Sequence, residues 1–392
     1  ERASLPDLRH WLRYDAEAEI WAADSGELPD LGDRSAVTED EPFCLLYTSG
    51  TTGRPKGAII THLGIVTSCM GSQDHLQLGD GETIILSVPA SHVTGIVLIL
   101  MLALRVAGKV VVQRGFKARD FLALAAREHM TFTCMVPAMY NLCLLDPDFT
   151  SFDLSSWRVG GFGGAPMAES SVAALARDLP QLELVNIYGS TESTSPAVMM
   201  PLGEGARRAD KVGRALPYAD LLIMDDQGRE CAPGEQGEIW IGGAMVVPGY
   251  WNNPEATANG FVDGFWKSGD LGTMDEEGYI RVLDRMKDMI NRGGYKIYSA
   301  EVENVLMAHD AIVEAVVVGR PCEVLGERVE AFAVASGPVE EEVLRAFCAE
   351  RLSNYKVPER IRLVPGPLPR NPNGKLLKTV VREWLQEPSD RA

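Results

Sequence analysis

The segment Tyr47-Thr-Ser-Gly-Thr-Thr-Gly-Arg-Pro-Lys-Gly57 decides how the rest of this 392-residue chain is interpreted. It places four hydroxyl side chains, three glycines and two cations directly after the apolar run 43–46, which predicts a strand. Glycines let backbone N–H groups approach an anion, hydroxyls add donors, and lysine adds a mobile positive charge. The segment therefore predicts a phosphate-binding loop. The alternative is a surface linker, but a linker needs neither the preceding strand nor the apolar run 58–60 that follows.

This loop differs from the P-loop of NTPases, which reads G-x-x-x-x-G-K-[ST]. Here Lys56 follows Arg54-Pro55 and precedes Gly57, so no hydroxyl stands after the lysine to ligate a metal. A P-loop kinase or ATPase is therefore disfavoured. An enzyme of that class would be recognised by its release of ADP or phosphate.

Length and composition limit the class of protein. A chain of 392 residues with 46% hydrophobic side chains suggests two or three domains with ample material for a core. Its net charge of −18 argues against nucleic acid or an anionic membrane as the main partner. Seven cysteines, none in C-x-x-C spacing, indicate reduced thiols in a cytoplasmic protein. The longest apolar run, 95–107, contains Arg105 and predicts a buried helix, so no integral membrane segment is expected.

Strand and helix patterns alternate after the loop. Strands are predicted at 83–88, 109–112, 131–136, 158–162 and 182–188, and helices at 63–70, 95–107, 118–128, 137–145 and 167–177. Such alternation predicts an α/β fold with a largely parallel sheet covered by helices on both faces. Ligands of these sheets bind at the carboxyl ends of the strands.

Three loops follow predicted strands and are expected to face one crevice. They read Pro89-Ala-Ser-His-Val-Thr-Gly95, Gly160-Gly-Phe-Gly-Gly-Ala-Pro166 and Tyr188-Gly-Ser-Thr-Glu-Ser-Thr194. The third combines hydroxyls with one carboxylate, Glu192, which suits Mg²⁺ beside triphosphate oxygens. The alternatives are a solvated surface acid for Glu192 and a packed or solvated side chain for His92.

The pattern changes near residue 218 to short strands with turn signals, which predicts a β-rich subdomain with a hairpin of strands 221–224 and 238–241. Further on, Asp270 and Arg285 are spaced to flank a sugar or a phosphate. Ordinary ion pairs are the alternative for both residues.

The last hundred or so residues form a second compositional unit, so the expected domains are 1–286 and a small α+β domain at 287–392. Gly293-Gly294 predicts a turn before a helix at 299–307, with Ser299 as its N-cap. Strands are predicted at 312–318, 329–334 and 360–364, and a helix at 339–351. Lys375 ends the loop Pro369-Arg-Asn-Pro-Asn-Gly-Lys375, and a solvated lysine is the alternative to a functional one.

Together these motifs resemble the adenylate-forming superfamily, which comprises acyl-CoA synthetases, firefly luciferase and the adenylation domains of peptide synthetases. The likeness is closest to fatty-acid or aryl acyl-CoA synthetases. The matches run in the family's order along nearly the whole chain: Tyr47–Gly57, Pro89–Gly95, Gly163-Gly-Ala-Pro166, Tyr188-Gly-Ser-Thr-Glu192, Ser268-Gly-Asp270, Asp284-Arg-Met-Lys-Asp288, Tyr355-Lys-Val-Pro358 and Pro369–Lys375.

The resemblance implies a ligase that works in two steps with ATP, Mg²⁺ and coenzyme A. A carboxylic acid first forms acyl-AMP with release of pyrophosphate, and Lys375 would bridge the acid and the α-phosphate. Glu192 would hold Mg²⁺ and Thr191 the α-phosphate. Other residues implied to bind the nucleotide are Thr48, Ser49, Gly50, Thr51, Thr52, Gly53, Lys56, Gly163, Gly164, Ala165, Asn186, Ile187, Tyr188, Gly189, Asp270 and Arg285.

For the thioester step, the resemblance implies that the small domain swings about Lys287 and brings Gly293 and Gly294 to the thiol. His92 would act near the thiol or the carboxylate. Residues Val93, Thr94, Gly161 and Phe162 are expected to line the acyl pocket, whose small and apolar side chains admit an alkyl chain or an aryl ring.

Several alternatives stay open. Coenzyme A is the expected acceptor because no carrier-protein signature follows Lys375, although a stand-alone adenylation domain that serves a carrier protein is an alternative. Only 46 residues precede Tyr47, whereas family members carry a domain-sized segment there, so the start of the large domain is expected to be missing. A catalytically incomplete nucleotide-binding homologue is therefore a further alternative. A homodimer is among the expected assemblies.

Overall fold

The computed structural model describes residues 12–15, 20–23, 37–48, 55–165, 167–370 and 376–386. The chain divides into two compact units, residues 1–41 and 42–392. In the first unit, β1 (Leu12–Asp15) and β2 (Ile20–Ala23) form an antiparallel pair. All other described elements belong to the second unit.

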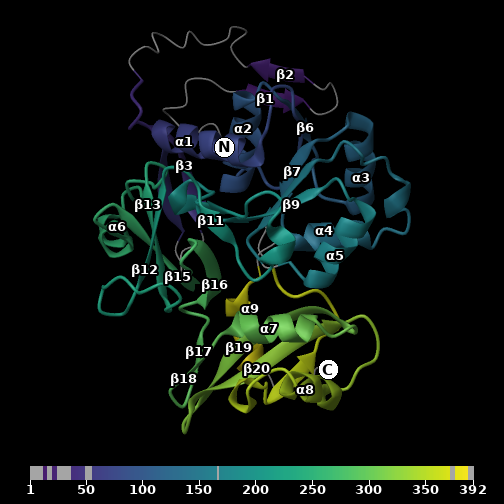
Figure 1. The fold of residues 1–392 in the computed structure, drawn as a ribbon, viewed down its shortest axis with the longest axis vertical. Coiled ribbons are helices and arrows are strands. Elements are labelled where there is room, and N and C mark those ends of the chain that lie inside the picture. The colour runs from purple at the N-terminus through teal and green to yellow at the C-terminus, as the bar shows by residue number, and fades with distance from the viewer. Residues whose placement is uncertain are drawn as a thin grey trace. The chain divides into compact units, whose positions relative to one another are not determined.

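A 12-stranded mixed sheet is the centre of the second unit (Figure 1). Its parallel part has the order β9-β8-β7-β5-β6, which confirms the predicted parallel sheet. These strands are β5 (Thr83–Leu86), β6 (Lys109–Val112), β7 (Phe132–Met135), β8 (Val159–Gly163) and β9 (Glu183–Tyr188). Helix α1 (His62–Leu76) precedes β5, and the helices between the five strands are η2 (Thr94–Met101), α2 (Leu102–Arg105), α3 (Ala118–Glu128), α4 (Pro137–Leu144), η3 (Phe149–Ser151) and α5 (Glu169–Asp178).

Helices cover both faces of this parallel part because its strands are apolar on both sides. Ile84 of β5 packs into a cluster with residues of α1, η2 and α2, whereas its neighbour Ile85 packs into a cluster with α3, α4 and α5. Successive residues of a strand point to opposite faces, so one strand serves both clusters. The helix predicted at 95–107 is divided into the π-helix η2 and the short α2.

Trp157 anchors the second of these clusters. It is 1% exposed, stacks on Tyr140 with ring centroids 5.8 Å apart, and meets Phe121 edge-on at 5.8 Å. Replacing Trp157 by alanine is expected to lower the free energy of unfolding by about 3–5 kcal/mol, because the core cannot fill the space that the indole leaves. A urea titration followed by circular dichroism measures this loss. An unchanged urea midpoint would contradict the assigned packing.

The β-rich part joins the same sheet instead of forming a separate one. β9 pairs with β10 (Val198–Met199), β10 with β11 (Gly213–Ala215) and β11 with β16 (Tyr279–Arg285). The other elements of this part are η4 (Thr191–Ser193), η5 (Gly205–Arg207), β12 (Ala219–Met224), β13 (Gly237–Gly243), α6 (Pro254–Gly260), β14 (Phe261–Val262) and β15 (Phe265–Met274). The predicted hairpin is confirmed by the antiparallel pairing of β12 with β13. The linking strands β10 and β11 are too short to show a sequence period.

A separate antiparallel hairpin flanks the predicted phosphate loop. It consists of β3 (Pro42–Thr48) and β4 (Lys56–Thr61). The loop therefore connects two paired strands, and α1 starts directly after β4. Thr61 caps that helix, since its Oγ1 accepts a hydrogen bond from the N–H of Gly64 at 3.1 Å.

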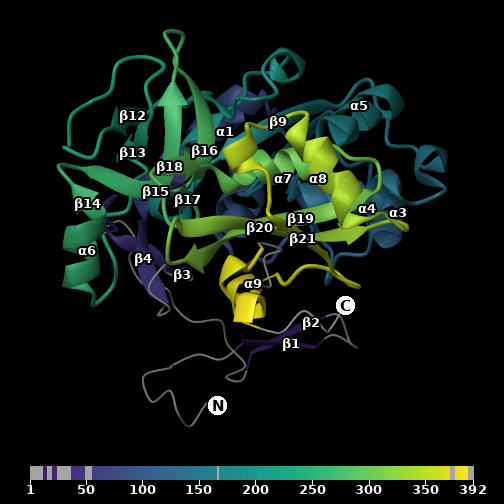
Figure 2. The same cartoon turned by 90° about the horizontal axis from the view of Figure 1, so that it is seen from below.

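The C-terminal residues form a five-stranded sheet with its own core (Figure 2). Helices α7 and α8 contribute to the cluster on one face, and α9 contributes to the cluster on the other. The elements are β17 (Ile290–Arg292), β18 (Tyr295–Ile297), α7 (Ser299–Met307), β19 (Ile312–Cys322), β20 (Gly326–Ala335), α8 (Glu341–Ala349), η6 (Asn354–Lys356), β21 (Arg360–Leu363), α9 (Lys378–Glu383) and η7 (Trp384–Gln386).

The prediction that Ser299 caps α7 is wrong. The helix begins at Ser299, and Tyr298 occupies the N-cap position without a side-chain cap bond. Asp284, at the end of β16, provides the cap instead, because its Oδ2 accepts hydrogen bonds from the Ser299 N–H and, at 2.8 Å, from the Ser299 hydroxyl. A carboxylate at a helix N-terminus is favoured by the helix dipole. The sequence could not reveal a cap that comes from another element.

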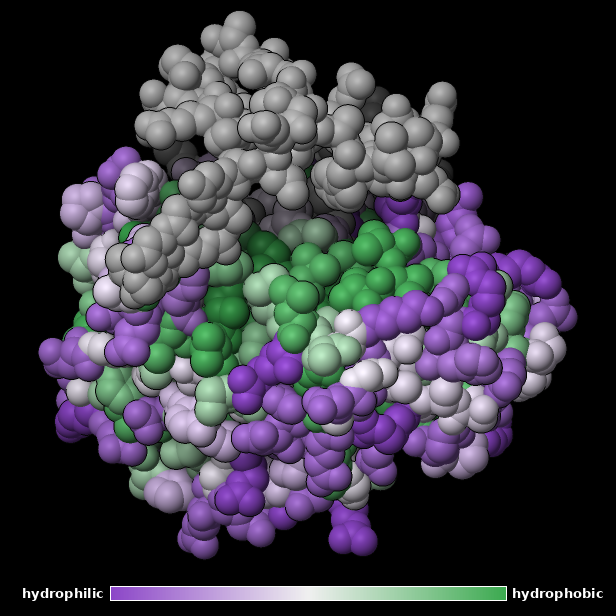
Figure 3. All heavy atoms as spheres, turned by 90° about the horizontal axis from the view of Figure 1, so that it is seen from above, coloured by the Kyte–Doolittle hydropathy of each residue, from purple (hydrophilic) through white to green (hydrophobic). Residues whose placement is uncertain are grey.

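Exposed apolar side chains gather on the side of the molecule that carries α1, α2 and β6. Val66 of α1 is 50% exposed, Leu104 of α2 is 72% exposed and Val112 of β6 is 63% exposed. Figure 3, which views the molecule from above, shows a continuous hydrophobic area. Contiguous apolar surface of this kind typically marks a contact face. Within the described residues, no helix is both long enough and apolar enough to span a bilayer.

Candidate active site

The two ends of the predicted phosphate loop lie side by side. Thr48 at the end of β3 and Lys56 at the start of β4 are register partners. The Thr48 Oγ1 donates to Glu192 Oε1 at 3.5 Å, so the loop is anchored beside the predicted metal ligand. The remaining predicted loop residues lie outside the described residues: Ser49, Gly50, Thr51, Thr52 and Gly53.

Glu192 is buried, with 6% of its surface exposed, in the short helix η4 after β9. Its Oε2 accepts from the Ser190 hydroxyl at 2.7 Å, and its Oε1 accepts from the Tyr250 hydroxyl at 2.9 Å and from Thr48. Within the described part of the chain, all of its hydrogen-bond partners are neutral hydroxyls, and no ion pair reaches it. A buried carboxylate without a cation partner is costly, which favours a bound cation here.

This environment fits Mg²⁺. Mg²⁺ is usually held by one or two carboxylates together with substrate phosphates and water. Glu192 supplies one carboxylate next to the loop that is predicted to hold phosphates. Thr191, the neighbouring residue, is 7% exposed and stands at the start of the same turn.

Tyr250 belongs to this site, although the motifs of the sequence did not include it. Its hydroxyl forms the hydrogen bond to Glu192 described above. Its ring centroid lies 5.0 Å from the Lys56 Nζ, in cation–π geometry. Burial raises the pKa of Tyr250, and the nearby Glu192 carboxylate raises it further, so its hydroxyl stays protonated as a donor. The run Pro248-Gly-Tyr-Trp251, a turn signal followed by aromatic residues, could have drawn attention to it.

The carboxyl ends of β8 and β9 meet where the sequence predicts the adenine-binding turn. Gly163 pairs with Ile187, and a Cβ on Gly163 would lie 2.2 Å from the Ile187 carbonyl oxygen, so only glycine fits. Gly164 and Ala165 follow and are exposed. The neighbouring Asn186 Nδ2 donates to the carbonyl oxygen of Lys211 at 3.5 Å, and Gly189 follows the end of β9.

Tyr188, Asp270 and Arg285 form one contact group. Asp270 on β15 and Arg285 on β16 are register partners, and Arg285 Nε lies 3.4 Å from Asp270 Oδ1. The Tyr188 hydroxyl donates to the other carboxylate oxygen, Oδ2, at 2.9 Å. Burial raises the pKa of Tyr188, and Asp270 adds to this rise. These side-chain contacts connect β9 to strands β15 and β16 of the β-rich part. The sequence indicated the three residues from separate motifs.

The predicted acyl-pocket residues are distributed over two clusters. Val93 is 3% exposed and packs in the cluster of η2, and Thr94 begins that helix. Phe162, 7% exposed, packs in the cluster on the other face of the sheet, next to Gly161, whose carbonyl oxygen accepts from the Tyr140 hydroxyl at 2.9 Å. His92 precedes η2, and its Nδ1 lies 3.3 Å from the N–H of Thr94. A pocket shared by these residues stays a prediction.

The predicted hinge residue lies between the two sheets. Lys287 sits in the turn between β16 and β17, and its carbonyl oxygen accepts from Arg382 of α9 at 3.3 Å. Arg382 also pairs with Asp288 at 2.8 Å. Lys375 lies outside the described residues, which resume at Leu376.

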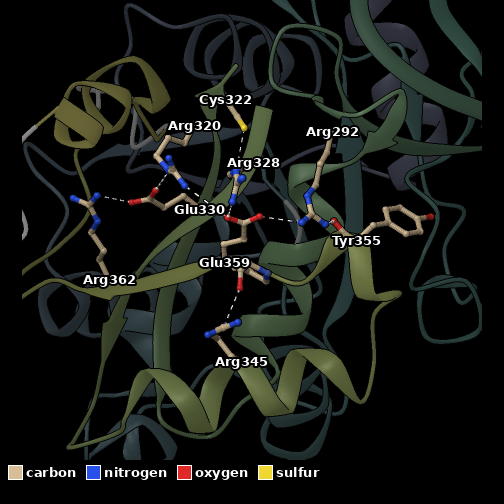
Figure 4. Close-up of polar contacts among 10 residues, drawn as sticks. Arg292, Arg320, Cys322, Arg328, Glu330, Arg345, Tyr355, Glu359 and Arg362 are labelled. Atoms are coloured by element: carbon tan, nitrogen blue, oxygen red, sulfur yellow. Dashed lines mark hydrogen bonds and ion pairs between the residues drawn. The ribbon is translucent and has the colours of Figure 1, made fainter. Parts of the chain in front are cut away.

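Gly293 and Gly294 form the turn of the β17–β18 hairpin, with φ values of +61° and +90° that favour glycine at both positions. Beside this hairpin lies a network of arginines and glutamates (Figure 4). Glu359 binds Arg292 at 2.9 Å and Arg328 at 2.7 Å. The remaining ion pairs join Arg320 to Glu330 and Glu359 and join Arg362 to Glu330. Four arginines thus pair with two glutamates, and a further acid, Glu327, lies at the same hairpin, where its Oε2 accepts from the Asn291 N–H at 2.7 Å.

Cys322 lies at the edge of this network. Its Sγ accepts a hydrogen bond from Arg328 Nε at 3.0 Å, which lowers the pKa of the thiol to about 7. The other six cysteines have raised pKa values because they are wholly or partly buried. All seven cysteines are unbridged, as predicted.

Comparisons with known proteins agree with this geometry. Residues 4–251 match the AMP-binding enzyme family, and residues 301–375 match the AMP-binding enzyme C-terminal domain. The chain is 34% identical over 374 residues to the long-chain-fatty-acid–CoA ligase FadD13 of Mycobacterium tuberculosis. The aligned region covers 95% of this chain and 73% of FadD13. It is 35% identical over 366 residues to the fatty acid–[acyl-carrier-protein] ligase ScoC of Streptomyces coeruleorubidus. The aligned region covers 91% of this chain and 70% of ScoC.

A solved structure shows the same fold. O-succinylbenzoate coenzyme A synthetase (MenE) from Bacillus subtilis, in complex with ATP and magnesium ion, superposes with a TM-score of 0.81 at 31% identity, over 89% of this chain and 71% of MenE. These matches confirm the resemblance seen in the motifs. The chain belongs to the AMP-binding enzyme family, within the adenylate-forming superfamily.

Proposed function

We propose that this protein is an AMP-forming acyl-CoA synthetase, an acid–thiol ligase that uses ATP and Mg²⁺. The observation that carries the proposal is the buried Glu192 carboxylate, which has only hydroxyl partners among the described residues and lies beside both described ends of the phosphate loop. The similarity to FadD13 supports coenzyme A as the acceptor, and that to MenE supports ATP with magnesium.

In the first step, a carboxylate oxygen attacks the α-phosphorus of ATP, the bond to the β-phosphate oxygen breaks, and pyrophosphate leaves. Two anions must meet, so catalysis depends on charge neutralisation and positioning. Lys56 and the N–H groups of the loop would hold the phosphates, and Asp270 would accept hydrogen bonds from the ribose hydroxyls. Glu192 would hold Mg²⁺, which supplies positive charge at the phosphate oxygens.

In the second step, the thiol of coenzyme A loses its proton, its sulfur attacks the acyl carbonyl, and AMP leaves. We assign the domains as residues 1–286 and 287–392, with Lys287 as the hinge between them. Arg292, which directly precedes Gly293 and Gly294, supports this acceptor, because coenzyme A carries several phosphate charges and arginine binds phosphate well.

The decisive experiment is acid-dependent ATP–pyrophosphate exchange across a panel of fatty and aromatic acids. We expect exchange with at least one acid class, followed by thioester formation when coenzyme A is added. Nucleotide binding without exchange with any acid would instead favour a catalytically incomplete homologue.

A second candidate differs only in the acceptor. The similarity to ScoC favours an enzyme that transfers the acyl group to a carrier protein. This second function would be identified by three results together. The protein would catalyse pyrophosphate exchange, form no thioester with coenzyme A, and load the acyl group onto a phosphopantetheinylated carrier protein. A cytoplasmic location and a homodimer stay predictions, as does a role in fatty-acid metabolism.

A further inference from the structure

A short segment, residues 245–251, connects the phosphate-loop hairpin to the turn that carries Glu192. We call it the brace. Four hydrogen bonds hold it, two to each side: Thr194 Oγ1 to the Met245 carbonyl oxygen at 2.6 Å, the Val247 N–H to the Glu192 carbonyl oxygen at 2.9 Å, the Ile59 N–H to the Gly249 carbonyl oxygen at 3.1 Å, and the Trp251 N–H to the Gly57 carbonyl oxygen at 2.7 Å. The brace therefore sets the spacing between the loop and the carboxylate.

Tyr250 is the residue of the brace whose side chain reaches both parts. Its hydroxyl donates to Glu192 Oε1 at 2.9 Å, and its ring lies 5.0 Å from the Lys56 Nζ. The ring is held in place by an edge-on contact with Phe261 at 5.6 Å, and the backbone N–H donates to Thr257 Oγ1 at 2.9 Å. Tyr250 itself is only 7% exposed. One rigid side chain thus contacts a cation and a carboxylate that serve the same phosphates in the proposed function.

The hydroxyl of Tyr250 controls the orientation of the carboxylate. Ser190 binds Oε2 at 2.7 Å and Tyr250 binds Oε1, whereas the third contact within the described residues, from Thr48 to Oε1, is long at 3.5 Å. A carboxylate offers about four lone-pair sites, so two close donors fix its plane and leave positions for a metal ion. Without the Tyr250 hydroxyl, a single close donor holds Glu192, and the group can rotate about its side-chain bonds.

We propose that Tyr250 is a positioning residue, which acts through Glu192 to hold the magnesium-binding carboxylate at a fixed place beside Lys56 and the phosphate loop. This inference rests on the proposed function. In this proposal Tyr250 does not contact the reacting atoms.

The test is Tyr250→Phe, which keeps the ring with its contacts to Lys56 and Phe261 and removes only the hydroxyl. Mn²⁺ serves as a paramagnetic substitute for Mg²⁺, and water proton relaxation reports its binding to the protein with ATP in the absence of acid. Loss of a group that orients a metal ligand typically weakens metal binding by about 10–100-fold, so a loss of that size is expected. In the exchange assay, the Mg²⁺ concentration for half-maximal rate should rise while the KM for the acid stays unchanged.

Two further variants separate positioning from simple destabilisation. Tyr279→Phe removes a comparable hydrogen bond, from a buried tyrosine to Glu204, and should leave metal binding and exchange unchanged. In a Glu192→Gln background, Tyr250→Phe should weaken Mn²⁺ binding no further, because the two residues act as one unit. Additive losses would show that Tyr250 does not act through Glu192.

The outcomes distinguish this inference from the proposed function. If the wild-type protein exchanges pyrophosphate but Tyr250→Phe binds Mn²⁺ with ATP as tightly as wild type, the positioning role is wrong and the ligase function stands. If the wild type shows no exchange but Tyr250→Phe weakens the Mn²⁺ complex, the positioning role stands and the ligase function is wrong.

Discussion

Replacing Lys375 by alanine is expected to slow acid-dependent ATP–pyrophosphate exchange by about 10²–10³-fold, the effect of losing one donor aimed at charge that develops in the transition state. The family resemblance implies that this lysine would bridge the acyl carboxylate and the α-phosphate. The chain has a net charge of −18, so a local cation is needed to bring two anions together.

The described residues on either side of positions 371–375 contact each other. Arg370 and Leu376 form an isolated β-bridge, and the Leu377 N–H donates to the Pro369 carbonyl oxygen at 2.8 Å. Arg370 also pairs with Glu314 at 2.8 Å.

Controls make the Lys375 experiment specific. Lys109→Ala removes a surface lysine that pairs with Glu128 and should leave exchange unchanged. Acyl-AMP supplied from outside should still react with coenzyme A in the Lys375→Ala variant, because the lysine is assigned to the first step alone. Full exchange activity in Lys375→Ala would remove the basis of the proposed mechanism.

Replacing Lys287 by proline is expected to preserve the exchange reaction and to lower the rate of thioester formation by about 10²-fold or more, the scale of loss when reacting groups are misplaced. Proline fixes φ near −65°, whereas a hinge must change its backbone angles as the domain swings. Within the described residues, the Lys287 N–H makes no backbone hydrogen bond that proline would remove.

The two half-reactions are measured separately, by pyrophosphate exchange and by thioester formation from supplied acyl-AMP and coenzyme A. Lys287→Ala serves as the control, since alanine keeps the backbone free and should support both steps. An equal loss of both half-reactions in Lys287→Pro would show that residue 287 is a structural position and not a hinge.

The sequence by itself determined the parallel part of the fold and predicted the chemistry of the site. The period of apolar residues identified the strands and helices between residues 83 and 188, because an element that buries one face repeats its apolar residues with the period of its own backbone. Hydroxyls and charges such as those of Thr48, Lys56 and Glu192 predicted phosphate and metal binding, because hydroxyls and cations suit an anion and a carboxylate suits Mg²⁺.

Only the tertiary structure decided which residues of distant elements act together. The strands β10 and β11 join the β-rich part to the parallel sheet, yet they are too short to produce a periodic pattern. Asp284 caps α7 from another element, and Tyr250 reaches Glu192 across 58 positions of the chain. Such contacts depend on how packed elements meet in space, and a hydrogen bond between two side chains leaves no local signal at either residue.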